Sequence, residues 1–170
     1  MATNRITPET ALSNPKQAYR YACHVIKERW PPGEPVIAQS AEWAFHYAYA
    51  VIQGRWPPGE PAIAQSAVYA FPYARDMLKE RWTAAEPAIA QDPYWAYRYA
   101  LRIIQGRWPP AEPVFAQYPQ FACYYAIEIL KDRFLLGEPT IVCSDRAREY
   151  FEYFRDSFTK REQVLWLLKL

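Results

Sequence analysis

The chain repeats itself at an interval of 26 residues. Each copy carries an Arg-Trp pair with a glutamate five positions after the arginine, and a further copy, Arg133-Phe134 with Glu138, has lost the tryptophan. A fixed period of about 20–50 residues is typical of proteins in which each unit packs on its neighbours and all units share one core. We therefore expect a tandem repeat protein. The full copies are Arg29, Trp30 and Glu34; Arg55, Trp56 and Glu60; Arg81, Trp82 and Glu86; and Arg107, Trp108 and Glu112.

Each copy reads as a short helix followed by a long one. Asp92-Pro93 marks the start of a long helix, because the aspartate can accept hydrogen bonds from free backbone N–H groups and proline suits the first helical position. Ser66 and Ser144 stand at equivalent starts, and Pro-Pro pairs such as Pro57-Pro58 are expected to stop the preceding long helix. Pro72 is expected to bend the helix that contains it. The long helices are predicted at about 15–29, 41–54, 67–81, 93–106, 119–133 and 145–158, each after a short α or 3₁₀ segment.

Small residues lie four apart in every long helix, as Ala44 and Ala48 do, and an apolar residue such as Val25 or Val51 follows them. This spacing predicts a buried stripe along the helix, where alanine lets neighbouring backbones approach closely. A row of tyrosines beside the stripe, at positions 21, 47, 73, 99 and 125, is expected to fill the seam between successive helices.

The two ends differ from the middle. Thr7-Pro8-Glu9 reads as a capped first helix, and Thr159 followed by Glu162 is a capping-box pattern that opens a last helix. We expect this last helix to fold back and close the end of the array, with a homodimer contact and a membrane-surface anchor as alternatives. The predicted fold is a single all-α domain, a short α-solenoid of about five to six two-helix repeats. Its repeats are placed at about 7–30, 31–56, 57–82, 83–108, 109–134 and 135–158, with a C-terminal cap at 159–170.

Composition restricts the partners and the compartment. The net charge of +2 gives no strong field for nonspecific binding of phosphates, and three cysteines at wide spacing predict neither a disulfide framework nor a zinc site. Met1 to Arg5 are polar and lead into no apolar run, and no apolar stretch is long enough to span a bilayer. We therefore expect a cytoplasmic protein with no membrane partner.

The run from Ile89 to Ala100, Ile-Ala-Gln-Asp-Pro-Tyr-Trp-Ala-Tyr-Arg-Tyr-Ala, resembles leucine-rich-variant repeats, in which a 3₁₀ segment alternates with an α-helix. The chain is also similar to uncharacterised tandem repeats of bacteriophage, large-virus and bacterial proteins built on Gly-Arg-Trp, Glu-Pro, Ile-Ala, Asp-Pro and Tyr-Ala. The resemblance covers about residues 7–158 and implies an architecture, with no activity attached. Leucine-rich-variant units are slightly shorter, and Cys23, Cys123 and Cys143 do not match the iron–sulfur cluster found beside some of them.

No catalytic constellation emerges from the sequence. His24 and His46 are the only histidines, and with Asp76 they fall on different helices, so we predict a solvated surface there and no metal site. Nucleophilic and nucleotide-hydrolysing chemistry have no residues to support them, and no cofactor is expected. The recurring Arg and Glu could bind an anion, but we favour the interpretation that each Arg pairs with a Glu, stacks on a Trp and forms a structural joint.

Three columns of the repeat vary from copy to copy and fall on one side of the long helices. A repeat array commonly uses such a variable face for recognition, and tyrosine and arginine are the usual anchors. We predict a non-enzymatic scaffold that binds a protein or peptide through this face. The alternative is a viral-type protein that sequesters a nucleotide signal, binds nucleic acid or inhibits a host defence. The candidate partner-binding residues are Arg20, His46, Tyr94, Arg98, Arg102 and Tyr124.

Overall fold

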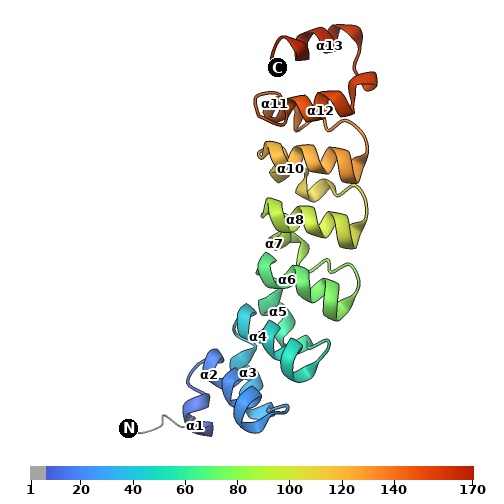
Figure 1. Cartoon of the computed structure of the whole chain (residues 1–170). Helices are drawn as coiled ribbons and strands as arrows, with labels where there is room; N and C mark the ends of the chain where they lie inside the picture. The colour runs from blue at the N-terminus through green and yellow to red at the C-terminus, as the bar shows by residue number, and fades with distance from the viewer. Residues whose placement is uncertain (1–6) are drawn as a thin grey trace. The chain divides into compact units, whose positions relative to one another are not determined.

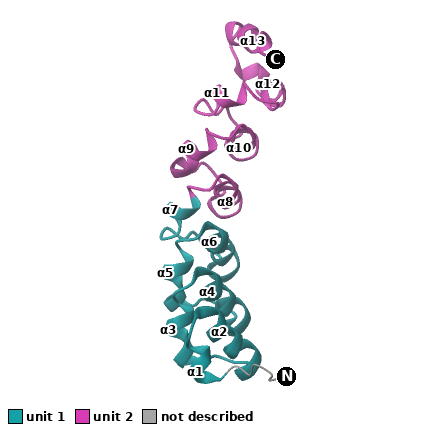
Figure 2. Cartoon of the chain, turned by 90° about the vertical axis from the view of Figure 1, so that its left-hand side faces the viewer, with its two compact units in different colours: residues 1–89 teal, residues 90–170 magenta. Residues whose placement is uncertain are grey.

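The computed structural model describes residues 7–170, and all regular structure in that part of the chain is helical. The chain forms two compact units, residues 1–89 and 90–170, each built from alternating short and long helices (Figure 1). Within each unit the short helices stack in one column and the long helices in a second column beside it (Figure 2). This is the predicted all-α repeat solenoid. The expectation about a secretory signal concerns residues 1–5, which lie outside the described residues.

Five of the six short helices begin at the Glu-Pro pairs that recur every 26 residues, and the first, α1, begins at Pro8. Proline at the second helical position has no N–H to lose, and in three copies a 3₁₀ turn formed by the Pro-Pro pair leads directly into the helix. The short helices are α1 (Pro8–Ala11), α3 (Glu34–Ile37), α5 (Glu60–Ile63), α7 (Glu86–Ile89), α9 (Glu112–Phe115) and α11 (Glu138–Ile141). The 3₁₀ turns are η2 (Pro31–Gly33), η4 (Pro57–Gly59) and η7 (Pro109–Ala111).

Each of the first five long helices starts as an α-helix and finishes as a π-helical segment. The α-helical parts are α2 (Pro15–Arg20), α4 (Ala41–Tyr47), α6 (Ala67–Tyr73), α8 (Pro93–Tyr99) and α10 (Pro119–Tyr124). The π-helical parts are η1 (Tyr21–Ile26), η3 (Ala48–Ile52), η5 (Ala74–Leu78), η6 (Ala100–Ile104) and η8 (Tyr125–Leu130). α6 continues through Pro72 as one helix.

The first five long helices end two or three residues earlier than predicted, so the expected Pro-Pro stop is wrong, and the sixth ends at Tyr153, five residues before the predicted position 158. In every copy the residue after the π-helical segment adopts a left-handed conformation, with φ between 53 and 61°, and ends the helix there. Its N–H closes the π turn, as in the bonds from Lys27 to Ala22 O and from Lys79 to Ala74 O, both 2.7 Å. These residues are Lys27, Gln53, Lys79, Gln105 and Lys131, none of them glycine.

Gly54 follows one of these left-handed residues, and its own φ is not positive. A Cβ built on Gly54 meets nothing within 4 Å, and Glu28, Glu80 and Asp132 occupy the same position in other copies. Because alanine reduces the entropy of the unfolded chain without strain here, we expect Gly54→Ala to raise the free energy of unfolding by about 0.4–1 kcal/mol. Urea unfolding checks this, with Gly106→Ala as a second copy of the same test. A loss of stability in both variants would contradict it.

Capping of the long helices follows the predictions only in part. Asn14 accepts a hydrogen bond from Gln17 N, and Asp92 accepts from Tyr94 N and Trp95 N. The Ser66 hydroxyl makes no capping bond, so that prediction is wrong. Ser144 accepts from Arg146 N, and the sixth long helix, α12 (Ala147–Tyr153), begins two residues later than expected.

The core is built from the predicted alanine and tyrosine rows. Ala44, Ala48 and Tyr47 are fully buried, as are their equivalents in the other central copies. Ile37, Ile63, Ile89, Phe115 and Ile141 of the short helices α3 to α11 are fully buried as well. The prediction that the apolar residues after the alanines are buried is wrong: Val25 is about half exposed (49%), and Val51, Met77, Ile103 and Ile129 are half-buried. The alanines permit the close approach of helices that the rings then fill.

A small-residue column sets the tilt of the tryptophan rings. The position three residues after the tryptophan is Gly33 or Gly59 in two copies and Ala85 or Ala111 in two others. A Cβ on Gly59 would lie 2.5 Å from the Trp56 ring. The interplanar angle between the tryptophan and its tyrosine is 57° and 62° in the glycine copies but 42° in both alanine copies. We infer that the ring rotates to admit the extra methyl group.

The C-terminal helix α13 (Lys160–Leu167) closes the second unit, after a 3₁₀ turn, η9 (Arg155–Ser157). Thr159 and Glu162 form the predicted capping box. Trp166 stacks on Tyr150 with ring centroids 5.5 Å apart and an interplanar angle of 19°, whereas Trp56 meets Tyr47 edge-on at 4.9 Å and 62°. The cap therefore supplies the tryptophan that a sixth Arg-Trp pair would have provided. Among residues 7–170, no helix is long and apolar enough to cross a membrane.

Candidate functional site

The Arg, Trp and Glu residues that recur every 26 residues form a hydrogen-bonded network, the repeat joint, which links one copy to the next. Arg29 donates to both oxygens of Glu34, through Nε at 2.6 Å and Nη2 at 3.2 Å. The Tyr47 hydroxyl, from the next long helix, donates to Glu34 Oε1 at 3.1 Å and accepts from Trp30 N at 2.9 Å. Tyr73 and Tyr125 make the same pair of bonds, to Glu60 and Trp56 N and to Glu112 and Trp108 N.

This network fixes the protonation states of its members. The bidentate bond from Arg29 is the main cause that lowers the pKa of Glu34. Burial raises the pKa of Tyr47 to about 12, and Glu34 adds to the shift. Each joint therefore combines an ionised Arg–Glu pair with a neutral tyrosine hydroxyl. The hydroxyl also accepts a hydrogen bond from a backbone N–H that would otherwise be buried without a partner.

The glutamates and tryptophans of the joint are largely buried, whereas the side chains of Arg29, Arg55, Arg81 and Arg107 are 55–68% exposed. Trp30, Trp56 and Trp108 are buried, and their rings lie against tyrosines of the core rather than forming stacking platforms for bases. The carboxylates that hold the arginines would repel a phosphate. These contacts favour the structural interpretation of the Arg, Trp and Glu columns over the alternative in which they hold nucleotides.

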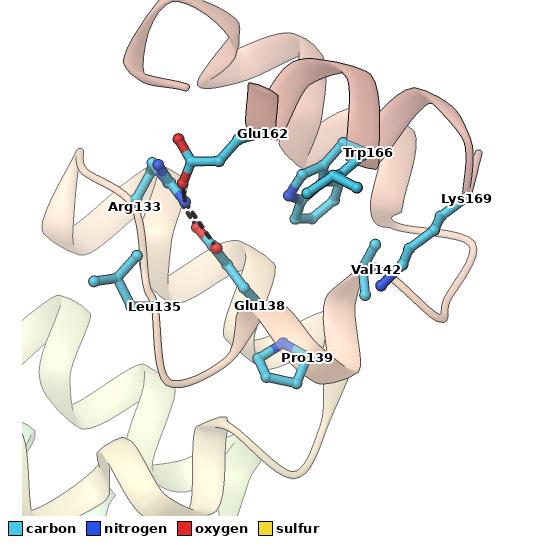
Figure 3. Close-up of a pocket in the computed structure, with 9 residues that line it drawn as sticks. Arg133, Leu135, Glu138, Pro139, Val142, Glu162, Trp166 and Lys169 are labelled. Carbon is cyan, nitrogen blue, oxygen red and sulfur yellow. Dashed lines mark hydrogen bonds and ion pairs between the residues drawn. The ribbon is translucent and has the colours of Figure 1, made fainter. Parts of the chain in front are cut away.

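The last joint is tied to the cap. Arg133 binds Glu138 through Nε at 2.7 Å and Nη2 at 2.9 Å, and Nη2 also reaches Glu162 Oε1 at 3.0 Å (Figure 3). Its guanidinium lies 4.0 Å from the centroid of the Phe158 ring. A groove of about 360 Å³ runs beside this cluster, with Pro139, Val142 and Trp166 on its walls and Lys169 at the far end (Figure 3).

The predicted recognition residues of the second unit come together in one pocket. Tyr94, Arg98, Arg102 and Tyr124 all line a hollow of about 310 Å³ between the fourth and fifth long helices, which we name the aromatic pocket. Tyr94 and Arg98 come from α8, Arg102 from η6 and Tyr124 from α10. They meet because residues four apart share a helix face and the two helices lie side by side. The other lining residues are Tyr97, Leu101, Gln120 and Phe121.

Aromatic rings form the floor of the aromatic pocket. The Tyr97 ring centroid lies 5.9 Å from that of Tyr124 and 6.2 Å from that of Phe121. Arg98 Nη1 donates to the Tyr94 hydroxyl at 2.6 Å, and its guanidinium lies 5.5 Å from the Tyr94 ring centroid. The pocket is therefore held in shape before any ligand arrives.

The side chains that line the aromatic pocket carry positive charge. Arg98 and Arg102 are the two charged residues among the lining side chains. Tyr97 donates its hydroxyl to Glu128 Oε2 at 2.7 Å, and burial followed by this bond raises the pKa of Tyr97. Within residues 7–170, exposed Arg102 has no carboxylate within ion-pair distance. Arg102 is therefore a cation free to bind an incoming anion.

Arg20 and His46 lie in the first unit and belong to a different environment. His46 is half-buried in a ring cluster, with its centroid 5.8 Å from Trp43, 6.1 Å from Tyr19 and 6.2 Å from Tyr69. The expectation that His46 lies on a solvated surface is wrong, because the aromatic columns of neighbouring copies converge on it. Arg20 is exposed at the end of α2.

Sequence reasoning missed half of the aromatic pocket. Tyr97 and Phe121 were not singled out, although the columns to which they belong are rich in rings: Tyr19, Phe45, Phe71 and Tyr97 in one, Trp43, Tyr69, Trp95 and Phe121 in the other. Recurring aromatic residues look like core in a sequence. Their half-burial, which distinguishes a pocket wall from a core, is a property of the folded surface.

Other reactive groups show no assembled site. In the part of the chain from residue 7 onward, no group of three or more His, Cys, Asp or Glu side chains could hold a metal ion. Cys123 is buried, and burial raises the pKa of its thiol to about 11, which keeps it protonated and unreactive.

Comparisons of the chain with protein-family models, with curated proteins and with solved structures give no match.

Proposed function

We propose that the protein is a non-enzymatic scaffold that binds a protein or peptide partner through the exposed side of its long helices. The aromatic pocket carries this proposal, since it gathers tyrosine, phenylalanine and arginine side chains on a surface. Tyr and Arg are enriched among the residues that dominate protein interfaces, because they offer large contact area and directional hydrogen bonds.

Reversing the charge of the aromatic pocket is the direct test. We expect Arg98→Glu with Arg102→Glu to abolish partner binding, because the pocket loses both of its cations. Neither residue is part of a repeat joint, so the free energy of unfolding should change by no more than about 1 kcal/mol. The measurement is quantitative capture of partners from lysate of the native host by immobilised protein, with urea unfolding in parallel.

The matched control is Arg155→Glu with Arg161→Glu, which makes the same change of charge at exposed positions outside the aromatic pocket. Partners that are lost with the pocket variant and kept with the control support the proposal. Equal capture by the wild type and by both variants would show that this face is not the binding site.

A further inference from the structure

We propose that the aromatic pocket receives an aromatic side chain of an acidic peptide segment, and that Arg102 binds a neighbouring Asp or Glu carboxylate of the same segment. This inference rests on the proposed function and specifies the chemistry of the partner. It follows from the size of the pocket, from the groups on its wall and from the charge around it.

The pocket has room for one ring-sized group. Its volume of about 310 Å³ is at the lower end of the range of small-molecule sites, which extends to about 1,000 Å³. Tyr97, Phe121 and Tyr124 present ring faces and edges at centroid separations of about 6 Å, and an added ring can pack against them in an offset or edge-on arrangement. An aromatic side chain therefore fits better than an aliphatic one.

The polar groups of the pocket determine what must accompany the ring. The hydroxyl of Tyr97 is committed to Glu128, and that of Tyr94 accepts from Arg98. Arg102 stands one helical turn beyond Arg98 and is exposed at the rim. A guanidinium matches a carboxylate through two parallel hydrogen bonds, so an acidic residue beside the bound ring would complete the site.

Aromatic rings with arginines can bind either a peptide or a nucleic acid, and the charges around the aromatic pocket favour a peptide. Single-stranded nucleic acid needs a basic groove that follows its backbone. Here acidic residues offset the positive charge next to the aromatic pocket. Glu128 accepts a hydrogen bond from the Tyr97 hydroxyl. Arg146, which lies over the Tyr124 ring, is paired with Glu149 at 3.0 Å. Arg102 has no carboxylate within ion-pair distance in the described part of the chain, and this one cation suits one acidic side chain.

The test uses blocked pentapeptides as probes and the wild-type protein with ¹³C-labelled tyrosines. Binding of Gly-Glu-Trp-Glu-Gly is followed by NMR shifts of Tyr94, Tyr97 and Tyr124. We expect this peptide to bind at least tenfold more tightly than Gly-Lys-Trp-Lys-Gly, which reverses the charge, and than Gly-Glu-Ala-Glu-Gly, which removes the ring. A short oligothymidylate is the nucleic-acid probe, and we expect it to bind more weakly than the acidic tryptophan peptide.

Arg102→Glu should weaken the acidic peptide at least tenfold and strengthen the lysine peptide, whereas Arg155→Glu should change neither. Equal binding of the acidic and basic peptides, tighter binding of the oligothymidylate, or no shift of the pocket tyrosines with any peptide would each overturn the inference. If those results occur while partner capture still depends on Arg98 and Arg102, the ligand chemistry is wrong and the proposed function stands. If partner capture is unchanged in the pocket variant, the proposed function itself fails.

Discussion

Replacing Trp166 with alanine is expected to lower the free energy of unfolding of the second unit by about 3–5 kcal/mol, the usual cost of removing a buried large ring. Trp166 is only 6% exposed, although it belongs to the last helix of the chain. Its ring stacks on Tyr150 and Phe151 at interplanar angles of 19° and 17° and also contacts Phe158. Without the tryptophan, the outer surface of the last repeat would be open to water.

The loss should be local, because each repeat in such an array is stabilised mainly by its immediate neighbours. Amide hydrogen exchange should therefore quicken in α12 and α13, and exchange in α3 and α4 of the first unit should remain as in the wild type. Chemical denaturation gives the total loss, and exchange shows where it falls.

Two matched variants distinguish the contribution of the Trp166 ring from that of any apolar side chain in α13. Trp166→Phe keeps an aromatic ring on Tyr150 and should recover more than half of the loss. Leu167→Ala removes an apolar side chain from the neighbouring residue, which is 57% exposed, and should cost less than about 0.5 kcal/mol. If Trp166→Ala proves as mild as Leu167→Ala, the cap does not replace the missing repeat tryptophan.

The architecture could be predicted from the sequence because its signals are periodic. Each copy contributes one more observation of the same column, so Ala44 and Tyr47 were read as buried residues from several equivalents at once. The Glu-Pro starts of the short helices and the Thr159 capping box follow local rules that depend on few neighbours. Repetition thus compensates for the weakness of each single signal.

The helix ends could not be predicted in the same way. The chain turns at Lys27, Gln53 and their equivalents, which are long polar residues in a left-handed conformation that usually costs about 1–2 kcal/mol outside glycine. Nothing in a lysine or glutamine indicates this geometry. It accompanies the π-helical turn, which the backbone N–H of the same residue closes, as Lys27 N does on Ala22 O.

The candidate site was half predicted for a related reason. Tyr94, Arg98, Arg102 and Tyr124 belong to columns that vary, and variation suggested a surface. Tyr97 and Phe121 belong to columns that are aromatic in most copies, and no variation marked these columns as a surface. The aromatic pocket takes residues from variable and from mostly aromatic columns. It exists only where α8 and α10 lie side by side in the fold.

The second large effect is loss of the fold between pH 10 and pH 12. Burial raises the pKa of Tyr47, Tyr73 and Tyr125 to about 12, and it also raises that of Tyr150. The ordinary pKa is 10.0, so the folded state prefers the neutral phenol. The resulting stability is complete below pH 10 and is lost as the pH rises toward 12. At about 1.4 kcal/mol per pKa unit, each residue contributes on the order of 3 kcal/mol, and three of them approach the whole stability of a domain.

Far-ultraviolet circular dichroism and tyrosinate absorbance should therefore change together in this range. Tyr49 is exposed and lies outside the repeat joints, so Tyr49→Phe should leave the unfolding midpoint unchanged. Ionisation of all tyrosines near pH 10 with the helices intact would contradict the assignment of these hydroxyls to the repeat joints.

Tyr125→Phe gives the sharpest version of the test. At neutral pH it should cost about 1–3 kcal/mol, because Trp108 N and Glu112 Oε1 both lose a partner in a buried place. The variant also lacks one of the groups that must ionise, so its deficit relative to the wild type should shrink as the pH rises from 10 to 12. Urea unfolding at several pH values measures that difference directly. A deficit that stays constant with pH would show that ionisation of the Tyr125 hydroxyl is not coupled to unfolding, which would contradict its raised pKa in the folded joint.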